Sequence, residues 1–237
     1  MEKLVKNDLF DYENRYIFQY ENAFKFSVDS ILLAEFVSGI KDKTQILDLC
    51  TGNCVIPLIL TTKSKCHIDA VELQKDIYDI ALKSVLYNNL EEYIYLYNID
   101  ALEINKHINK KYDIIICNPP YFKVEEKSLV NKNKKLNIAR HELKIKLEDI
   151  FKIASKYLND GGVLFMVHIS SRLDEIIVLG RKYNLGIKKV QLIKTKHNKK
   201  PSIVLVKAIK NSSNGIIFDD VLNIENLKSY KNIFREK

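Results

Sequence analysis

The stretch I-L-D-L-C-T-G-N-C, residues 46–54, decides the fold of this chain. Its first four residues form a short apolar run, and a helical pattern begins just after it at Val55. Between them lies a tight turn in which Gly52 supplies the small residue needed where backbone and ligand approach closely. The stretch therefore predicts a buried strand followed by a helix, which is the opening unit of an α/β fold. The turn between them either faces a ligand or is a plain strand-to-helix connection.

Outward from this unit, short apolar runs alternate with helical stretches. Strands are expected at 67–72, 93–98, 112–117 and 163–168, and helices at 29–37, 75–87, 147–158 and 171–183. Alternating strands and helices predict an α/β protein with a Rossmann-like, doubly wound and mostly parallel sheet. The last two expected strands, 188–194 and 202–208, flank a polar turn and predict an antiparallel C-terminal hairpin at the sheet edge.

Length and composition are those of one globular domain, with 237 residues, 46% hydrophobic and 29% charged. We expect an N-terminal extension at 1–43, a catalytic core at 44–210 and a tail at 211–237. No apolar run approaches the roughly 18 residues needed to span a bilayer, and residues 1–20 do not resemble a signal peptide. We therefore expect a cytoplasmic monomer with no membrane partner.

Neither the cysteines nor the net charge identifies a site. The four cysteines form no C-x-x-C pair and no cluster with histidine, so no metal is expected. The net charge of +8 favours a polyanionic partner. However, only 5 of the 38 basic residues are arginine, and an AT-rich coding sequence would give the same lysine excess. The charge therefore favours nucleic-acid binding only modestly.

Polar residues follow two of the predicted strands, at the edge where parallel sheets bind ligands. Glu72 lies 72 − 48 = 24 positions after Asp48, and a carboxylate there can accept both hydroxyls of a ribose. Asp100, followed by Ala101, could accept a hydrogen bond from the amine of a bound adenine. Each has a simpler alternative: Glu72 as a solvated charge, and Asp100 as the N-cap of a helix at 102–107.

The tetrapeptide Asn118-Pro119-Pro120-Tyr121 directly follows the most apolar predicted strand, 112–117. Its two prolines lack backbone N–H groups and fix φ twice, which leaves rigidly placed carbonyl groups. The Asn118 side chain adds an acceptor, and Tyr121 offers a flat surface. We expect Asn118 Oδ1 and the Pro119 carbonyl to accept the two N–H groups of a planar amine, with Tyr121 stacked on its ring.

In this order, these features resemble the class I S-adenosylmethionine methyltransferases with an N-P-P-Y active site, over about residues 24–210. The resemblance implies the class I methyltransferase fold and S-adenosyl-L-methionine as cofactor. The expected site residues are catalytic Asn118, Pro119, Pro120 and Tyr121, and cofactor-binding Asp48, Cys50, Gly52, Glu72, Asp100, Ala101 and Asn118. One departure is that Cys50 and Cys54 stand where the pattern mostly has glycine, which puts cofactor affinity in question.

Three further stretches are similar to the bacterial tRNA(Val) adenine-N6 methyltransferases: F-S-V-D-S-I-L-L-A at 26–34, D-L-C-T-G-N at 48–53 and A-R-H-E at 139–142. This similarity implies methylation of the exocyclic N6 of an adenine near the anticodon, with tRNA as partner. Basic segments at 123–146 and 181–200 could bind its phosphates, or could be solvated lysine-rich surface. His141 and Glu142 could approach the site, whereas His168 is more typical of a structural histidine.

Other substrates remain open under the same resemblance. Release-factor glutamine methyltransferases usually carry a helical N-terminal domain, and only about 45 residues precede the first expected strand. Ribosomal RNA guanine methyltransferases are often built from two copies of the fold, and DNA adenine methyltransferases usually need a larger recognition domain. A non-catalytic RNA-binding module is supported by Cys50 and Cys54, and the intact motif at 118–121 speaks against it.

Overall fold

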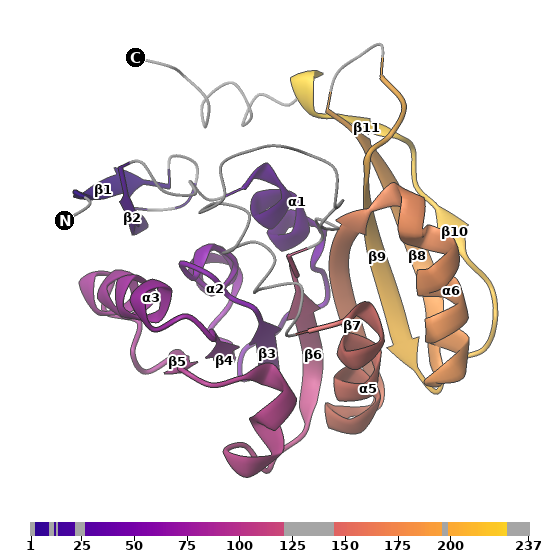
Figure 1. The fold of residues 1–237 in the computed structure, drawn as a ribbon, viewed down its shortest axis with the longest axis horizontal. Coiled ribbons are helices and arrows are strands. Elements are labelled where there is room, and N and C mark those ends of the chain that lie inside the picture. Colours follow the sequence, from indigo (N-terminus) through magenta and orange to yellow (C-terminus); the bar gives the residue numbers. More distant parts are fainter. Residues whose placement is uncertain are drawn as a thin grey trace, which may run out of the picture.

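The computed structural model describes residues 3–9, 12, 14–21, 27–120, 145–195 and 199–226. A nine-stranded sheet runs through the molecule (Figure 1). In sheet order its strands are β10 (Ile217–Phe218), β8 (Leu185–Lys194), β9 (Ile203–Lys210), β7 (Leu158–Ile169), β6 (Tyr112–Cys117), β3 (Gln45–Leu49), β4 (His67–Val71) and β5 (Ile94–Tyr97), with β11 (Leu222–Asn223) also beside β8.

The strand directions confirm the predicted fold class. Strands β5, β4, β3, β6 and β7 are parallel, and β9 is antiparallel to both β7 and β8. The expectation that the β8–β9 hairpin forms the sheet edge is wrong, because β10 and β11 pair with β8 in parallel. These two strands are so short that no periodic pattern marks them in the sequence.

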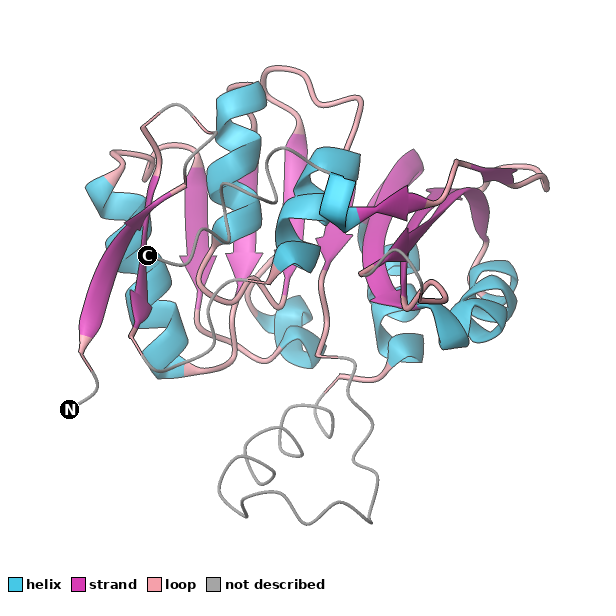
Figure 2. Ribbon diagram, turned by 90° about the horizontal axis from the view of Figure 1, so that it is seen from above, coloured by secondary structure: helices cyan, strands magenta, loops and turns pink. Residues whose placement is uncertain are grey.

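Helices cover both faces of the sheet (Figures 1 and 2). One face carries α1 (Val28–Phe36), α2 (Val55–Lys63) and α3 (Lys75–Tyr87), and the other carries α5 (Leu147–Tyr157), α6 (Leu173–Lys182) and the 3-10 helix η1 (Ala101–Lys106). A hydrophobic core lies on each face of the sheet. Along β3, Ile46 packs in the core under α1, α2 and α3, and Leu47 packs in the core under α5 and α6, as the two-residue period of a strand requires. None of the helices in the described ranges could cross a membrane.

Several elements differ from their predicted bounds. The expected helix at 171–183 begins as a 3-10 turn, η2 (Ser170–Arg172), before α6. The strand expected at 163–168 is longer than predicted, because β7 begins at Leu158 and includes Gly161, which takes a left-handed φ of 76°. A 3-10 turn, η3 (Ile224–Asn226), follows β11. Such shifts at the ends of elements follow from local turn geometry, on which hydrophobic periodicity carries little information.

An N-terminal hairpin, formed by β1 (Leu4–Asp8) and β2 (Tyr16–Tyr20), was not predicted from the sequence. It is docked on α3 by side-chain hydrogen bonds to its backbone. The Phe18 N–H donates to Ser84 Oγ at 3.0 Å, and the Tyr16 N–H donates to Asn88 Oδ1 at 2.9 Å. Lys6 Nζ also donates to the Tyr87 hydroxyl at 2.8 Å. The hairpin therefore packs directly against α3.

Candidate active site

The carboxyl ends of β3 and β6 lie side by side at the centre of the sheet, where Leu49 is paired with Cys117. The chain continues from β3 to one side, through β4 and β5, whereas β6 leads to the other side. A doubly wound sheet binds ligands at this kind of switch point. The topology therefore brings the turn at 50–54 and the Asn118-Pro119 segment together at one edge, as the sequence predicts.

The turn after β3 contains three left-handed residues, with φ of 59° at Cys50, 60° at Gly52 and 71° at Cys54. Glycine adopts this conformation freely, whereas for a residue with a Cβ the left-handed conformation is less favourable by about 1–2 kcal/mol. A Cβ built on Gly52 would meet no atom within 4 Å. The space beside Gly52 is therefore open, and the two cysteines hold strained backbone conformations on either side of it.

Glu72 follows β4 and braces this turn. Its Oε2 accepts a hydrogen bond from the Gly52 N–H at 2.9 Å, and its Oε1 accepts one from the Gln74 N–H at 2.9 Å. The side chain is buried, so it is no solvated charge. Burial raises its pKa, and the two backbone donors partly offset that rise. Because a carboxylate has about four acceptor positions, Glu72 can still receive hydroxyl groups of a ligand.

Asp48 and Thr51 contribute buried polar atoms that are unsatisfied. Within the described ranges, the two carboxylate oxygens of Asp48 and the hydroxyl of Thr51 all lack a hydrogen-bond partner. Burial raises the pKa of Asp48 to about 7, the nearby Thr51 hydroxyl lowers it and the charge of Glu72 raises it further. Folded proteins seldom leave buried polar groups unpaired. These atoms and the open space beside Gly52 therefore fit a small polar ligand.

Replacing Asp48 with asparagine is expected to change how stability depends on pH. The folded-state pKa of about 7 lies above the ordinary value of 3.8, so the folded protein binds the Asp48 proton more tightly than the unfolded chain. The wild type should therefore lose stability as pH rises from about 4 to about 7, by up to about 1.4 kcal/mol per pH unit. The Asp48→Asn variant should lose less folding stability over the same pH range.

Denaturant unfolding at about pH 5 and about pH 8 measures this difference for the two proteins. The result that contradicts the prediction is a pair of parallel pH profiles, because Asp48 would then titrate as an ordinary carboxylate.

Asp100 caps the 3-10 helix η1, and its Oδ1 accepts a hydrogen bond from the Leu102 N–H at 2.9 Å. The structure therefore confirms the capping alternative for one oxygen of Asp100. Ala101, beside Asp100, is buried.

Sequence reasoning missed Asn98, whose Nδ2 donates to the carbonyl oxygens of Glu72 at 2.9 Å and Leu73 at 3.0 Å. The only sequence signal for Asn98 is its place directly after a strand.

Asn118 follows β6 and contacts the start of α1. Its Nδ2 donates to Ser30 Oγ at 2.9 Å and lies 3.5 Å from Ser27 Oγ. Ser27 is the N-cap of α1, since its side chain accepts from the Ser30 N–H, and Asp29 lies in the first turn. Burial raises the pKa of Asp29 to about 6. Sequence reasoning noted the 26–34 stretch by resemblance but did not place these serines against Asn118.

Several predicted site residues lie outside the described ranges. Tyr121 of the tetrapeptide is one, and His141 and Glu142 are two more. Pro119 is buried and Pro120 is half-buried beside Asn118. The predicted catalytic segment is thus described through Pro120, and both its catalytic role and the stacking role of Tyr121 stay predictions.

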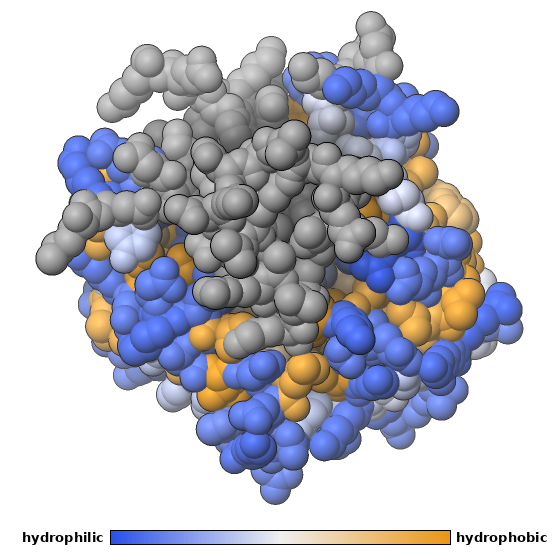
Figure 3. All heavy atoms as spheres, viewed as in Figure 1, coloured by the Kyte–Doolittle hydropathy of each residue, from blue (hydrophilic) through white to orange (hydrophobic). Residues whose placement is uncertain are grey.

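The predicted phosphate-binding segments are described only in part, since most of 123–146 lies outside the described ranges. In 181–200, three lysines are already engaged within the protein. Lys182 pairs with Glu148 at 2.6 Å, Lys189 pairs with Asp219 at 2.7 Å, and Lys188 Nζ donates to the Ser213 carbonyl at 2.7 Å. Figure 3 shows hydrophilic residues spread over much of one face, interspersed with smaller hydrophobic areas.

His168 lies near the carboxyl end of β7, and the structure agrees with its interpretation as a structural histidine. Its Nδ1 accepts a hydrogen bond from the Ile169 N–H at 2.9 Å. Burial, with a smaller effect of the Arg172 charge, lowers its pKa to about 4. The ring is therefore neutral near pH 7.

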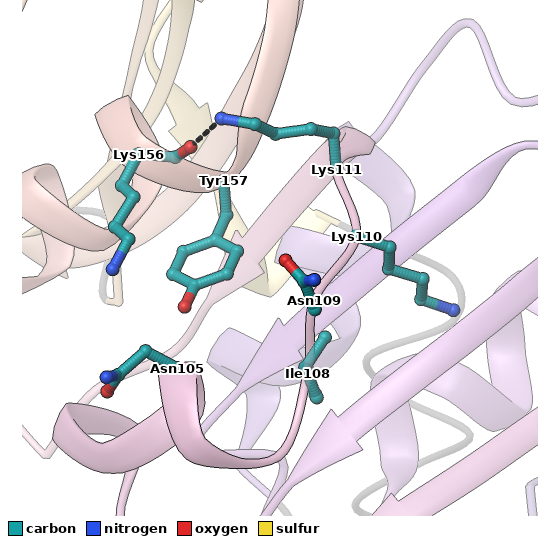
Figure 4. A pocket seen from close by; sticks show the side chains of 7 residues that line it. All are labelled: Asn105, Ile108, Asn109, Lys110, Lys111, Lys156 and Tyr157. Carbon is teal, nitrogen blue, oxygen red and sulfur yellow. Dashed lines mark hydrogen bonds between the residues drawn. The ribbon is translucent and has the colours of Figure 1, made fainter.

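A pocket at the amino end of β6 lies at the opposite edge of the sheet from this site (Figure 4). Its lining residues are Asn105, Ile108, Asn109, Lys110, Lys111, Lys156 and Tyr157. Lys110 turns away from Tyr157 and pairs with Asp69 at 2.7 Å, while Lys111 Nζ donates to the Lys156 carbonyl. Two of its three ammonium groups are therefore already bound within the protein. No group of three or more potential metal ligands occurs in the described part of the chain.

Comparison with known proteins identifies relatives of the chain. Residues 25–184 match the family model for the methyltransferase small domain. A tRNA1(Val) (adenine(37)-N6)-methyltransferase of Histophilus somni is 30% identical over 205 residues, which is 86% of this chain and 84% of that protein. One of the same name from Cytophaga hutchinsonii is 27% identical over 163 residues, or 69% and 67% of the two chains.

A solved structure shares the fold. It is a predicted O-methyltransferase from Agrobacterium tumefaciens, which superimposes with a TM-score of 0.65 at 19% identity. The match covers 83% of this chain and 88% of that one. At this identity the likeness concerns the fold alone.

Proposed function

This chain belongs to the methyltransferase small domain family, and we propose that it methylates the exocyclic N6 of an adenine in tRNA with S-adenosylmethionine as donor. The observation that carries the proposal is the placement of Asn118 and Pro119 beside the Gly52 turn, at the carboxyl ends of the paired strands β3 and β6. A planar amine held by Asn118 and Pro119 would meet a cofactor held by the Gly52 turn at the carboxyl ends of these strands.

The cofactor-binding residues of this proposal are Asp48, Cys50, Gly52, Glu72, Asp100, Ala101 and Asn118. Two structural features support them: the open space beside Gly52 and the unsatisfied oxygens of Asp48. When bound, S-adenosylmethionine supplies a methyl group on a sulfonium, so that the leaving group is already good. Glu72, held in place by two backbone donors, would accept the ribose hydroxyls.

The acceptor amine is the difficult partner, because its nitrogen lone pair is delocalised into the adenine ring. Asn118 Oδ1 and the Pro119 carbonyl would accept its two N–H groups and favour a tetrahedral nitrogen whose lone pair is free. The positive charge that develops on nitrogen would then lie among preorganised dipoles. Tyr121 would stack on the base and offset part of the cost of turning it out of a folded loop.

The substrate class rests on the relatives. Proteins named tRNA1(Val) (adenine(37)-N6)-methyltransferase align with 69% to 92% of this chain, which favours an adenine beside the anticodon of tRNA(Val) over guanine in ribosomal RNA or glutamine in a release factor. Basic residues of the segments 123–146 and 181–200 would bind tRNA phosphates, with an affinity that falls as salt rises. We propose that the protein acts as a monomer in the cytoplasm.

A substrate panel tests this proposal. Purified protein and radiolabelled S-adenosylmethionine are incubated separately with unmodified tRNA, unmodified ribosomal RNA and an unmethylated release factor, and initial rates are compared. We expect label in tRNA at a rate at least about tenfold above the other two substrates. Faster labelling of ribosomal RNA or of the release factor would contradict tRNA as the substrate. Labelling of none of the three would favour a non-catalytic RNA-binding module.

A further inference from the structure

The side chain of Asn118 is held by a pair of serines on α1. Its Nδ2 lies 2.9 Å from Ser30 Oγ and 3.5 Å from Ser27 Oγ. The two hydroxyl oxygens are 3.3 Å apart, and Ser27 Oγ also accepts from the Ser30 N–H at 3.3 Å. Ser27 and Ser30 thus form a small hydrogen-bonded group at the first turn of α1, fixed by the helix itself.

In this contact Nδ2 faces α1, so Oδ1 is the end of the Asn118 carboxamide that faces away from α1. The amide has a donor end, Nδ2, and an acceptor end, Oδ1, and they exchange places when the group rotates by half a turn. Either hydroxyl can donate in the Ser27–Ser30 contact. When Ser30 is the donor, its Oγ can only accept from Asn118, which keeps Nδ2 toward α1. Within the described ranges, Oδ1 has no hydrogen-bond donor of its own, so it is available to a ligand.

The orientation matters for the proposed reaction, because only Oδ1 can accept an N–H group of the adenine amine. A carboxamide turned the other way would present two N–H groups to the amine and repel it. The backbone of Asn118 is also restricted, since it precedes Pro119 and is kept out of the helical region. The serine pair therefore completes the fixing of an acceptor whose main chain is already constrained.

We propose that Ser30, supported by Ser27, is a positioning residue that holds Asn118 Oδ1 toward the amine to be methylated. The inference rests on the proposed function for its catalytic consequence. The contact itself, between Asn118 Nδ2 and Ser30 Oγ, is independent of that function. Ser30 acts through Asn118 and need not touch either substrate.

Ser30 is the better residue to change. It lies inside the first turn of α1, where alanine is the most favourable helix former, so Ser30→Ala removes the hydroxyl and leaves the helix intact. Ser27 is the N-cap of α1, and its replacement would weaken the helix as well as the contact. Thr62→Ala on α2 is a matched control, because it removes a hydroxyl whose hydrogen bond, among the described residues, goes to the Ile59 carbonyl of its own helix.

Steady-state kinetics with the tRNA substrate give the first test. We expect Ser30→Ala to lower kcat about 10- to 100-fold, the scale of a misplaced reacting group, with KM for S-adenosylmethionine changed less than about threefold. Ser30→Thr, which keeps a hydroxyl, should recover most of kcat, and Thr62→Ala should match the wild type. Wild-type kcat in Ser30→Ala would overturn the proposal, as would a loss confined to KM for S-adenosylmethionine.

A second readout needs no activity. In protein labelled with 15N-asparagine, the side-chain NH2 signals of Asn118 are identified by their absence from Asn118→Asp. We expect these signals to shift and their hydrogen exchange to accelerate in Ser30→Ala but not in Thr62→Ala. Unchanged signals would overturn the proposal even if the enzyme methylates tRNA, whereas a shift in a protein that methylates no tRNA would contradict the proposed function and leave the contact standing.

Discussion

Asn118→Ala is expected to lower kcat for tRNA methylation by about 100- to 1,000-fold while leaving the affinity for S-adenosylmethionine within about threefold of the wild type. The substitution removes a preorganised dipole that would act on the charge developing at the amine nitrogen, and losing one such group typically has this effect on rate. Asn118 is one of seven proposed cofactor-binding residues, and in the described part of the chain the Gly52 turn and Glu72 bond to each other and not to Asn118. Most of the cofactor contacts should therefore survive the substitution. Single-turnover kinetics and isothermal titration calorimetry measure the two effects separately.

Asn105→Ala provides the control for this substitution. Asn105 lines the pocket at the opposite edge of the sheet (Figure 4), so the same chemical change there should leave both kcat and cofactor affinity unchanged. Asn118→Ala with wild-type turnover would remove Asn118 from the mechanism. A loss of cofactor affinity as large as the loss of kcat would instead make Asn118 mainly a cofactor-binding residue.

Gly52→Val is expected to weaken S-adenosylmethionine binding by about 100-fold or more. Gly52 has a left-handed φ of 60°, which a residue with a Cβ adopts at a cost of about 1–2 kcal/mol, and more when it is β-branched. The new side chain would also project into the open space where the cofactor is proposed to lie. Calorimetry gives the affinity, and denaturant unfolding gives the accompanying loss of stability.

Gly39→Val separates backbone strain from blocked binding. Gly39 also has a left-handed φ, 80°, with no atom within 4 Å of an added Cβ, and it lies between α1 and the amino end of β3. It should lose a comparable amount of stability and keep full affinity. If the two variants lost affinity equally, strain would explain the effect and the space beside Gly52 would not be the cofactor site.

Much of the fold could be predicted from the sequence because its strands and helices have strong and distinct periodicities. The helix Lys75–Tyr87 and the strand Tyr112–Cys117 have the bounds expected of them. The N-terminal hairpin could not be predicted, since its position depends on hydrogen bonds to Ser84 and Asn88 of α3. Strands β10 and β11 are two residues each, too short for any pattern to identify.

The site was predictable where it follows the ends of strands, as at Gly52, Glu72 and Asn118. It was not predictable where it depends on how distant segments pack. Ser30 and Asn118 are 88 residues apart, and they meet only because α1 packs against α2 and β7 in the folded chain. The spacing of Glu72 likewise indicated a ribose ligand, but not its hydrogen bond to the Gly52 backbone.

The strained cysteines have a similar explanation. Sequence reasoning treated Cys50 and Cys54 as a departure that could weaken cofactor binding through their Cβ atoms. The structure shows that both residues share the left-handed conformation of Gly52, so the departure also involves backbone strain. Strain of this kind persists only where the surrounding structure enforces it, and it is concentrated at functional sites.

Mass spectrometry of nucleosides is the most direct test of the central claim. An unmodified tRNA(Val) transcript is incubated with the protein and labelled S-adenosylmethionine, then digested and separated. We expect labelled N6-methyladenosine, which should be lost when the adenine beside the anticodon is replaced by guanine and lost with Asn118→Ala. Label in another nucleoside, or no label from a protein that binds the cofactor, would contradict it.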